Sequence, residues 1–468
     1  EMFTFQLALA QERARLRTRT GAVLNGETRL TGQFGASLPF ALTASQIRAI
    51  NELYAELSAP SQMNRILIGD VGSGKTIVAF YAALRAVECG WQAVIMAPTE
   101  LLAEQHFTNF NRTCGALGVT AALLTGKVGA RQRGTLRRAL QRGDIAVAFG
   151  THALIQEGVA MSRLGVAIID EQHRFGVFDR ARLMALGSNA NVLLMTATPI
   201  PRSLAMTLFR SLAVSSLDEL PPGRTIVTTE LVDEDTLNSV HSRVRAELES
   251  GHRAYYVLPL IEGEDDPDSV YATANRLRTG PLQGFSIGIL HGRMRPAEKD
   301  EVMRQFREGT IQVLVATTVV EVGIDVPQAT SIVVIAAERY GVAQLHQLRG
   351  RVGRGTDASR CWLIVSREVG PQARARVERL ARCKSGAEVA ELDLRMRGPG
   401  DLFGARQTGA LPLRFARFIR DFQLIEQAGD LAEEWLRHDP ELNTAESKGI
   451  RSALARMLEY GFSLADVG

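Results

Sequence analysis

The sequence predicts an α/β protein with two tandem domains, each built on a parallel β-sheet, followed by a mainly helical C-terminal region. Short, nearly continuous apolar runs alternate with longer amphipathic stretches, which is the pattern of buried parallel strands covered by helices. This pattern occurs twice, and a Pro/Gly-rich break at Asp218–Gly223 separates the two copies. The chain has 468 residues, which is too long for one ordinary core. Its composition, 46% hydrophobic and 22% charged, is that of a globular protein.

The expected elements follow this alternation along the chain. A leading helix over Phe3–Arg19 precedes the first domain, whose strands are separated by helices such as Thr76–Glu88 and Glu100–Asn111. The expected strands of the first domain are Arg65–Gly69, Ala93–Ala97, Ala121–Leu124, Ile145–Phe149, Val166–Ile169 and Val192–Met195. Those of the second are Tyr255–Leu260, Ser286–Leu290, Gln312–Val315, Ile332–Ala336 and Cys361–Val365. We therefore expect a lead-in over residues 1–38, domains over 39–217 and 218–368, and a helical region over 369–468.

Composition and charge exclude several classes of protein. No apolar run reaches the roughly 18 residues of a membrane span, and Met2–Ala10 lacks the features of a signal peptide. The four cysteines form no C-x-x-C pair, which favours a reducing compartment and disfavours a zinc site.

The net charge of the whole chain is only +3, but Pro371–Arg420 holds 11 Lys/Arg against 5 Asp/Glu, a local net of +6. A basic segment suggests a polyanionic partner, although a solvated helix face is an equal alternative at this stage.

A phosphate-binding loop follows the first expected strand. The run Gly69-Asp70-Val71-Gly72-Ser73-Gly74-Lys75-Thr76 matches G-x-x-x-x-G-K-[ST] and stands between a strand and a helix, as the motif requires. Backbone N–H groups around Gly72, Ser73 and Gly74 can surround phosphates, and the helix N-terminus adds positive potential. Lys75 should reach the β- and γ-phosphates, and Thr76 should ligate Mg²⁺. A Gly-rich turn with a surface lysine is the alternative that this context disfavours.

Two carboxylates, Asp170 and Glu171, end the apolar run Val166–Ile169. Because the sequence also contains a complete phosphate loop, Asp170 would hold Mg²⁺ from the side opposite Thr76, and Glu171 would polarise the attacking water. GTPases and transport ATPases share the phosphate loop, but the sequence contains neither Asn-Lys-x-Asp nor Leu-Ser-Gly-Gly-Gln. The motifs therefore indicate ATP hydrolysis with ATP and Mg²⁺ as cofactors.

Two further motifs are of the kind found in helicases. Met195-Thr196-Ala197-Thr198-Pro199 follows a strand at a spacing that would place Thr196 and Thr198 beside the carboxylates. In the second domain, Gln347–Arg354 fits Q-x-x-G-R-x-G-R. Its Arg351 and Arg354 would stabilise charge on the transferring phosphate, as arginine fingers do, in a cleft that closes on ATP. A nucleic-acid patch or a plain loop is the alternative reading of this run.

The ordered series of motifs resembles superfamily 2 helicases and, most specifically, the RecG family of bacterial DNA helicases. The resemblance extends from about residue 38 to 425. The runs that carry it are Gly69–Thr76, Ala97–His106, Gly150–Gln156, Asp170–Val177, Thr196–Arg202, Asp218–Arg224, Leu290–Met294, Thr317–Pro327 and Gln344–Gly355. The transcription-repair coupling factor shares several of them. Its carboxylate motif usually reads Asp-Glu-Glu-Gln, whereas this chain has Asp-Glu-Gln-His at Asp170–His173.

The resemblance implies two tandem RecA-like P-loop NTPase lobes with ATP between them, and it assigns further roles by position. Gln46 matches the residue that reads adenine, and Gly323 and Asp325 match a motif that links the second lobe to the nucleotide. His173 and Gln347, with Thr196 and Thr198, match residues that couple nucleotide state to lobe closure. The positions that match motifs gripping the nucleic-acid backbone are Pro98, Thr99, Glu100, Gly126, His152, Thr317 and Thr318. Each of these residue types alone is more often a cap, a turn or a core residue.

The run Asp393–Gly409 resembles the RecG translocation motif, a helical hairpin followed by a loop. Arg395, Arg397, Arg406 and Gln407 match its polar positions, which gives the local positive charge a specific explanation in contact with DNA phosphates. The density of Gly and Pro predicts a mobile loop rather than a helix over this run.

The family implies a helicase of the 3'-5' class that remodels stalled forks and migrates Holliday junctions in recombination and repair. It also implies a bacterial, cytoplasmic, nucleoid-associated monomer that binds double-stranded and branched DNA and no membrane. Contact with single-strand DNA-binding protein stays open.

RecG proteins carry an OB-fold wedge before the motor, and residues 1–38 are too short to hold one. We therefore expect motor and translocation elements in this chain. Two alternatives are an ATP-gated DNA-binding module with little unwinding and a coupling-factor-like translocase.

Overall fold

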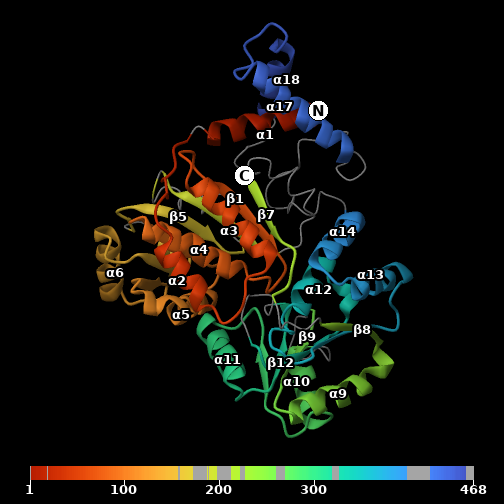
Figure 1. The fold of residues 1–468 in the computed structure, drawn as a ribbon. Helices are drawn as coiled ribbons and strands as arrows, with labels where there is room; N and C mark the ends of the chain where they lie inside the picture. The colour runs from red at the N-terminus through yellow and green to blue at the C-terminus, as the bar shows by residue number, and fades with distance from the viewer. Residues whose placement is uncertain are drawn as a thin grey trace. The chain divides into compact units, whose positions relative to one another are not determined.

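The computed structural model divides the chain into two compact units (Figure 1). The first unit is Glu1–Glu219 with Asp393–Gly468, and the second is Leu220–Leu392, so the first boundary falls inside the expected Pro/Gly-rich break. The structure describes residues 2–17, 19–155, 159–171, 187, 189–197, 212–221, 227–259, 269–318, 326–397 and 422–459. Within these ranges, no helix has both the length and the apolar composition needed to cross a lipid bilayer.

The first unit contains a parallel sheet of seven strands in the order β3-β4-β2-β5-β6-β1-β7. The pairings of neighbouring strands are all parallel. The strands are β1 Asn64–Gly69, β2 Gln92–Met96, β3 Ala121–Leu124, β4 Val147–Gly150, β5 Leu164–Ile169, β6 Asn191–Thr196 and β7 Ala213–Leu217. The helices that accompany them are α2 Arg29–Ser37, α3 Ala44–Leu57, α4 Lys75–Glu88, α5 Glu100–Cys114 and α6 Ala130–Arg142.

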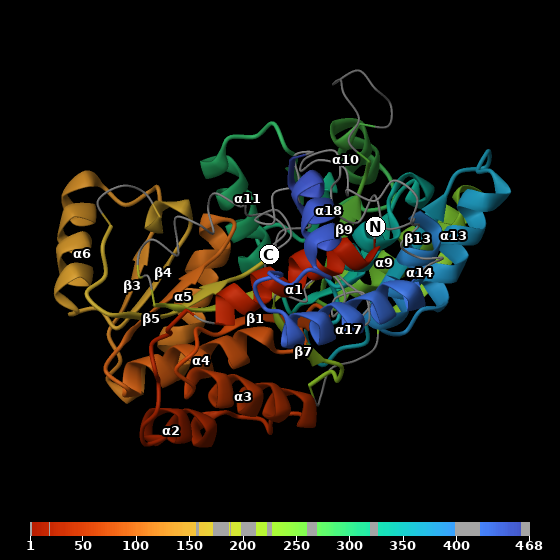
Figure 2. The same ribbon diagram turned by 90° about the horizontal axis from the view of Figure 1, so that it is seen from above.

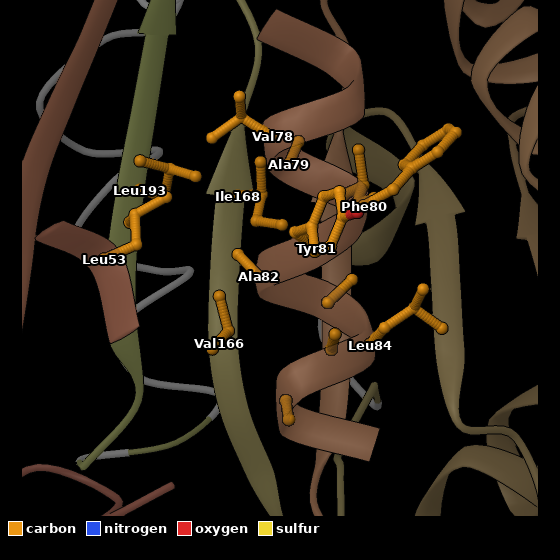
Figure 3. Packing of buried hydrophobic residues seen from close by; sticks show 14 of the residues in the cluster. Leu53, Val78, Ala79, Phe80, Tyr81, Ala82, Leu84, Val166, Ile168 and Leu193 are labelled. Carbon is orange, nitrogen blue, oxygen red and sulfur yellow. The ribbon is translucent and has the colours of Figure 1, made fainter. Parts of the chain in front are cut away.

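Both faces of this sheet are buried because side chains alternate along each strand and helices cover both faces. On β5, Val166 and Ile168 join one hydrophobic cluster, whereas Ala167 and Ile169 join the cluster on the opposite face. Helix α4 packs its apolar side onto the first of these faces, where Val78 and its neighbours meet β5 and β6 (Figure 3). These buried strands therefore read in the sequence as continuous apolar runs rather than as alternating ones.

The second unit contains a six-stranded parallel sheet in the order β10-β11-β9-β12-β13-β8. Its strands are β8 Thr228–Asp233, β9 Arg253–Val257, β10 Ile287–Leu290, β11 Val313–Ala316, β12 Ala329–Val334 and β13 Arg360–Val365. Its helices are α9 Leu237–Glu249, α10 Val270–Thr279, α11 Pro296–Glu308, α12 Val342–Arg349 and α13 Pro371–Arg382. Helix α14, Gly386–Arg397, begins in this unit and crosses the boundary at Leu392. The predicted fold class, two α/β lobes with parallel sheets, is confirmed.

Helices from the two ends of the chain pack together in the first unit. Helix α1, Met2–Arg17, lies beside α17, Phe422–His438, and also contacts α18, Lys448–Glu459 (Figures 1 and 2). Leu7, Ala8 and Ala432 are at most 1% exposed in this small core. The ring of Phe3 meets that of Trp435 edge to face, with centroids 6.2 Å apart. The predicted helical character of the leading segment and of the described C-terminal residues is therefore observed.

Two details differ from the sequence prediction. Strands β7 and β8 were not expected, because Ala213–Leu217 and Thr228–Asp233 are interrupted by polar residues and are only partly buried, which leaves them without a continuous apolar run. The prediction of a loop over Asp393–Gly409 is wrong at its start, since α14 continues through Arg397. The helix-breaking residues begin only at Gly398, and the residues before it have no reason to leave the helix.

Candidate functional site

Three neighbouring strands of the first unit bring the predicted nucleotide-binding residues to one edge of the sheet. The phosphate loop follows β1, Thr196 ends β6, and Asp170 follows β5. Strand β6 pairs with β1 on one side and with β5 on the other, both in parallel. The carboxyl ends of parallel strands meet at the same edge, where ligands bind in open α/β sheets. Thr196 is 2% exposed and is the register partner of Ile68, next to the start of the loop.

The phosphate loop has the backbone conformation that its glycines allow. Gly72 and Gly74 have φ angles of 76° and 88°, in the left-handed region that other residues rarely adopt. Lys75 is 9% exposed, and its Nζ donates hydrogen bonds to the carbonyl oxygens of Gly69 at 2.8 Å and Asp70 at 3.0 Å. The lysine is thus held against the loop from which it would reach a phosphate. Thr76 lies in the first turn of α4 and is half-buried.

Gln46 connects the start of α3 to the phosphate loop. Its Oε1 accepts the backbone N–H of Thr43 at 3.0 Å, and its Nε2 donates to the carbonyl oxygen of Ser73 at 2.8 Å. The side chain is 1% exposed. The Thr43 hydroxyl completes a capping box by accepting the backbone N–H of Gln46. Gln46 therefore positions the loop, and its predicted contact with adenine stays a prediction.

Asp170 is 8% exposed, and its carboxylate has two defined hydrogen bonds. Its Oδ1 accepts the backbone N–H of Glu171 at 3.0 Å, and its Oδ2 lies 2.8 Å from Nε2 of His106. Burial by itself would raise the pKa of Asp170, but the His106 hydrogen bond and charge, Lys75 and the Glu171 N–H together lower it below its usual value. Asp170 is therefore ionised at neutral pH. Glu171 has a φ of 52°, a strained conformation for a residue with a side chain.

The residues at this edge have the chemistry of a nucleotide–Mg²⁺ site. An ionised carboxylate on Asp170 and the hydroxyl of Thr76 are hard oxygen ligands of the kind Mg²⁺ prefers. A Cβ at Gly74 would lie 2.1 Å from Nε2 of Gln46, so the loop has no room for a larger residue there. The Oγ of Ser73 is buried with no hydrogen-bond partner among the described residues. The donor set and the tight loop fit ATP with Mg²⁺.

The predicted nucleic-acid residues of the first unit follow the other strands, β2, β3 and β4. Thr99 caps α5 by accepting the N–H of Leu102 at 3.3 Å, with Pro98 just before it. Gly126 lies against Glu100, since a Cβ there would come within 2.8 Å of Oε1 of Glu100. The structure thus brings Pro98, Thr99, Glu100 and Gly126 together at one end of the sheet. The remaining residue, exposed His152, follows β4 in a short 3₁₀ turn.

The predicted residues of the second unit follow its own strands and α12. Thr317 comes directly after β11, and its Oγ1 is buried without a hydrogen-bond partner in the described part of the chain. Thr318 follows it and is half-buried. Gln347 lies on α12 and is 9% exposed, whereas Arg351, just beyond that helix, is 3% exposed. The Nε of Arg354 donates to the carbonyl oxygen of Gly350 at 3.1 Å.

Some predicted residues lie outside the described ranges, and others are described only in part. Those outside are His173, Thr198, Gly323, Asp325, Arg406 and Gln407. Arg395 is exposed on α14, and Arg397 is the last residue of that helix. The roles assigned to all of these residues stay predictions.

Two residues inside the motif runs have defined contacts but were not predicted as site residues. His106 contacts Asp170, as described above. Arg349 ends α12, and its Nη1 donates to the carbonyl oxygen of Cys383 at 2.7 Å, between α13 and α14. Both stand inside motif runs, but their partners are 64 and 34 residues away, so no local pattern indicates the contacts.

Comparisons with known proteins agree with this geometry. The family model of DEAD/DEAH box helicases matches residues 43–207, and that of the helicase conserved C-terminal domain matches residues 236–356. A third model, ATP-dependent DNA helicase RecG, domain 3, C-terminal, matches residues 383–463.

Full-length relatives are similar across nearly the whole chain. The ATP-dependent DNA helicase RecG of Synechocystis sp. is 42% identical over 445 residues, which cover 94% of this chain and 53% of that protein. The RecG of Acidithiobacillus ferridurans is 42% identical over 463 residues, which cover 98% and 67% respectively. A solved structure of RecG bound to a three-way DNA junction superposes with a TM-score of 0.76 at 42% identity, covering 91% of this chain and 56% of that one. The chain spans about half to two thirds of the length of these relatives.

Proposed function

The chain belongs to the RecG family of ATP-dependent DNA helicases, and we propose that it hydrolyses ATP to move along double-stranded DNA and to remodel branched DNA. The observation that carries this proposal is the edge of the first sheet at which the phosphate loop, Thr196 and Asp170 follow three neighbouring parallel strands. The relative bound to a three-way junction supports branched DNA, such as stalled forks and Holliday junctions, as the substrate class.

The residues of the phosphate loop bind and orient the nucleotide in this proposal. Lys75 exchanges its hydrogen bonds with the carbonyl oxygens of Gly69 and Asp70 for bonds to the β- and γ-phosphate oxygens. The backbone N–H groups at the start of α4 and the positive end of that helix add to the binding of the phosphates. Gln46 keeps the loop in this conformation through its bond to Ser73.

Thr76 and Asp170 would hold Mg²⁺, which neutralises charge on the phosphate oxygens when it is bound. Glu171 orients the attacking water. Its strained backbone supports this role, because such strain persists where the surrounding structure fixes a residue in a specific position. We propose that Arg351 and Arg354 of the second unit stabilise the charge that develops on the transferring phosphate.

Movement on DNA requires contacts with the phosphate backbone that change with the nucleotide. We assign these contacts to Thr99, Glu100 and Gly126 in the first unit and to Thr317 in the second, with the arginines of residues 393–409 as the translocation element. They involve no base readout, so affinity for DNA should fall steeply with salt and vary little with sequence. We further propose that the protein acts as a cytoplasmic monomer and that residues 1–38, 39–217, 218–368 and 369–468 form its four parts.

The test is the ATPase rate without DNA and with linear duplex, single strand or a model fork. Stimulation by duplex DNA is expected, together with loss of hydrolysis in Lys75→Ala and in Glu171→Gln. The Gln variant is expected to keep nucleotide binding because its side chain changes charge but hardly changes shape. Normal hydrolysis by either variant would contradict the assignment of the site.

A second candidate is a nucleotide-gated DNA-binding module that does not separate strands. The chain spans 53% to 67% of the length of these relatives, so strand separation by this chain needs a test of its own. Strand displacement on a fork, measured in parallel with the ATPase rate, distinguishes the two. Stimulated hydrolysis without displacement would favour the module, and equal stimulation by fork and linear duplex would place junction recognition outside this chain.

A further inference from the structure

Helix α5 touches the predicted metal ligand through one side chain. His106 is 4% exposed, and its Nε2 lies 2.8 Å from Oδ2 of Asp170, which is 64 residues further along the chain. The two residues come after neighbouring strands of the sheet. His106 lies on α5, which follows β2, and Asp170 follows β5, which pairs with β2. The backbone N–H of Asp170 also donates to the carbonyl oxygen of Met96, the last residue of β2, at 2.9 Å. Asp170 is therefore bonded through its backbone to β2 and through its side chain to α5.

The two hydrogen bonds of the carboxylate set its orientation without using up its capacity. Oδ1 accepts the N–H of Glu171 and Oδ2 accepts from His106, so one N–H approaches each oxygen. A carboxylate has about four acceptor positions, so these two hydrogen bonds by themselves do not saturate it. Without His106, the hydrogen bond on Oδ2 would be lost, and the carboxylate would be held less firmly against rotation about its χ2 angle.

The same helix begins at residues to which the proposed function assigns DNA contact. Thr99 caps α5 and Glu100 is its first residue. His106 is seven positions beyond Thr99, about two turns or roughly 10 Å along the axis. Helix α5 is unbroken over 15 residues, so its backbone connects the N-terminus directly to the residue that carries the imidazole.

We propose that His106 is a positioning residue: it orients Asp170 and transmits movement of α5, caused by DNA at its N-terminus, to the metal-binding carboxylate. This inference rests on the proposed function. It names one physical connection through which DNA would stimulate ATP hydrolysis. A purely structural histidine would have the same hydrogen bond, but its loss would lower stability without changing the response to Mg²⁺ or to DNA.

Two polar substitutions separate these roles. In His106→Gln the amide nitrogen reaches about as far as Nε2 and can still donate to Asp170, whereas in His106→Asn the amide ends near the position of Nδ1 and falls short. His241→Gln is the matched control, because it removes a buried histidine hydrogen bond in the second unit, between Nδ1 and the hydroxyl of Tyr256 at 2.9 Å. Thermal unfolding of all three variants shows whether any of them has lost its fold.

The first measurement is binding of mant-ADP as a function of Mg²⁺ concentration, without DNA. His106→Asn is expected to bind mant-ADP normally in EDTA but to need at least about fivefold more Mg²⁺ for the metal-dependent increase in affinity. His106→Gln and His241→Gln should match the parent protein. The second measurement is the ratio of duplex-stimulated to basal ATPase rate, which should fall at least about tenfold in His106→Asn and recover largely in His106→Gln.

The inference is overturned if His106→Asn keeps both the Mg²⁺ dependence and the stimulation ratio of His241→Gln. It is also overturned if His106→Gln is as defective as His106→Asn, because the hydrogen bond would then not be the cause. Failure of the proposed function looks different: the parent protein itself would show no DNA stimulation. In that case the mant-ADP measurement still decides whether His106 positions Asp170, and the transmission from DNA is refuted.

Discussion

Substitution of Gly74 by alanine should disable the phosphate loop for two reasons that the structure separates. Gly74 has a φ of 88°, and a Cβ there would lie 2.1 Å from Nε2 of Gln46. The Gln46 amide cannot simply move aside, because its side chain is 1% exposed and bonded at both ends, to Thr43 and Ser73. Gly90 provides the matched control: its φ is 77°, and nothing lies within 4 Å of its Cβ position.

The size of the effect follows from these two terms. An alanine in the left-handed region costs about 1–2 kcal/mol. Displacing the Gln46 amide also sacrifices its hydrogen bond to Ser73, a net loss of about 1 kcal/mol. In Gly74→Ala the loop conformation that binds phosphate is therefore disfavoured by about 2–3 kcal/mol. Since a tenfold change in affinity corresponds to about 1.4 kcal/mol, nucleotide affinity should fall about 30- to 150-fold.

The assay is mant-ADP binding by fluorescence, with urea unfolding of the same variants. Gly90→Ala should lose about 1–2 kcal/mol of unfolding free energy and keep the affinity of the parent protein. Gly74→Ala should lose affinity while remaining folded. If both variants bind mant-ADP equally well, the loop does not depend on the contact between Gly74 and Gln46, and the reasoning is refuted.

Two further predictions concern stability. Burial, with a smaller contribution from the charge of Arg276, lowers the pKa of His241 from 6.5 to about 4. The unfolded chain then binds more protons between these values, so the free energy of unfolding should fall by about 2 kcal/mol from pH 7 to pH 5, and urea titrations of His241→Gln should lack this part of the dependence. Glu88 accepts the N–H groups of Leu30 and Thr31 and pairs with Arg85 at 2.8 Å, with both charged side chains at most 4% exposed. Glu88→Ala should therefore cost about 3 kcal/mol in urea unfolding, and an unchanged midpoint would contradict the role of this buried pair.

Patterns that depend only on neighbouring residues could be predicted from the sequence. The strand runs of the first domain were each recovered to within a few residues, because a strand buried on both faces must be apolar along its length. The phosphate loop was recognised because its function requires glycines at fixed spacing before a helix. Edge strands β7 and β8 and the end of α14 were missed, since a partly buried strand and a helix end have no strong local pattern.

The sequence by itself determined the fold class, the family and the residue types that perform the chemistry. It could not determine the partners of those residues. That His106 holds Asp170, that Gln46 spans from the cap of α3 to Ser73, and that Arg349 reaches the carbonyl of Cys383 follow only from the folded chain. The physical reason is that strand order in a parallel sheet places residues dozens of positions apart within hydrogen-bond distance, whereas a sequence pattern records only the spacing along the chain.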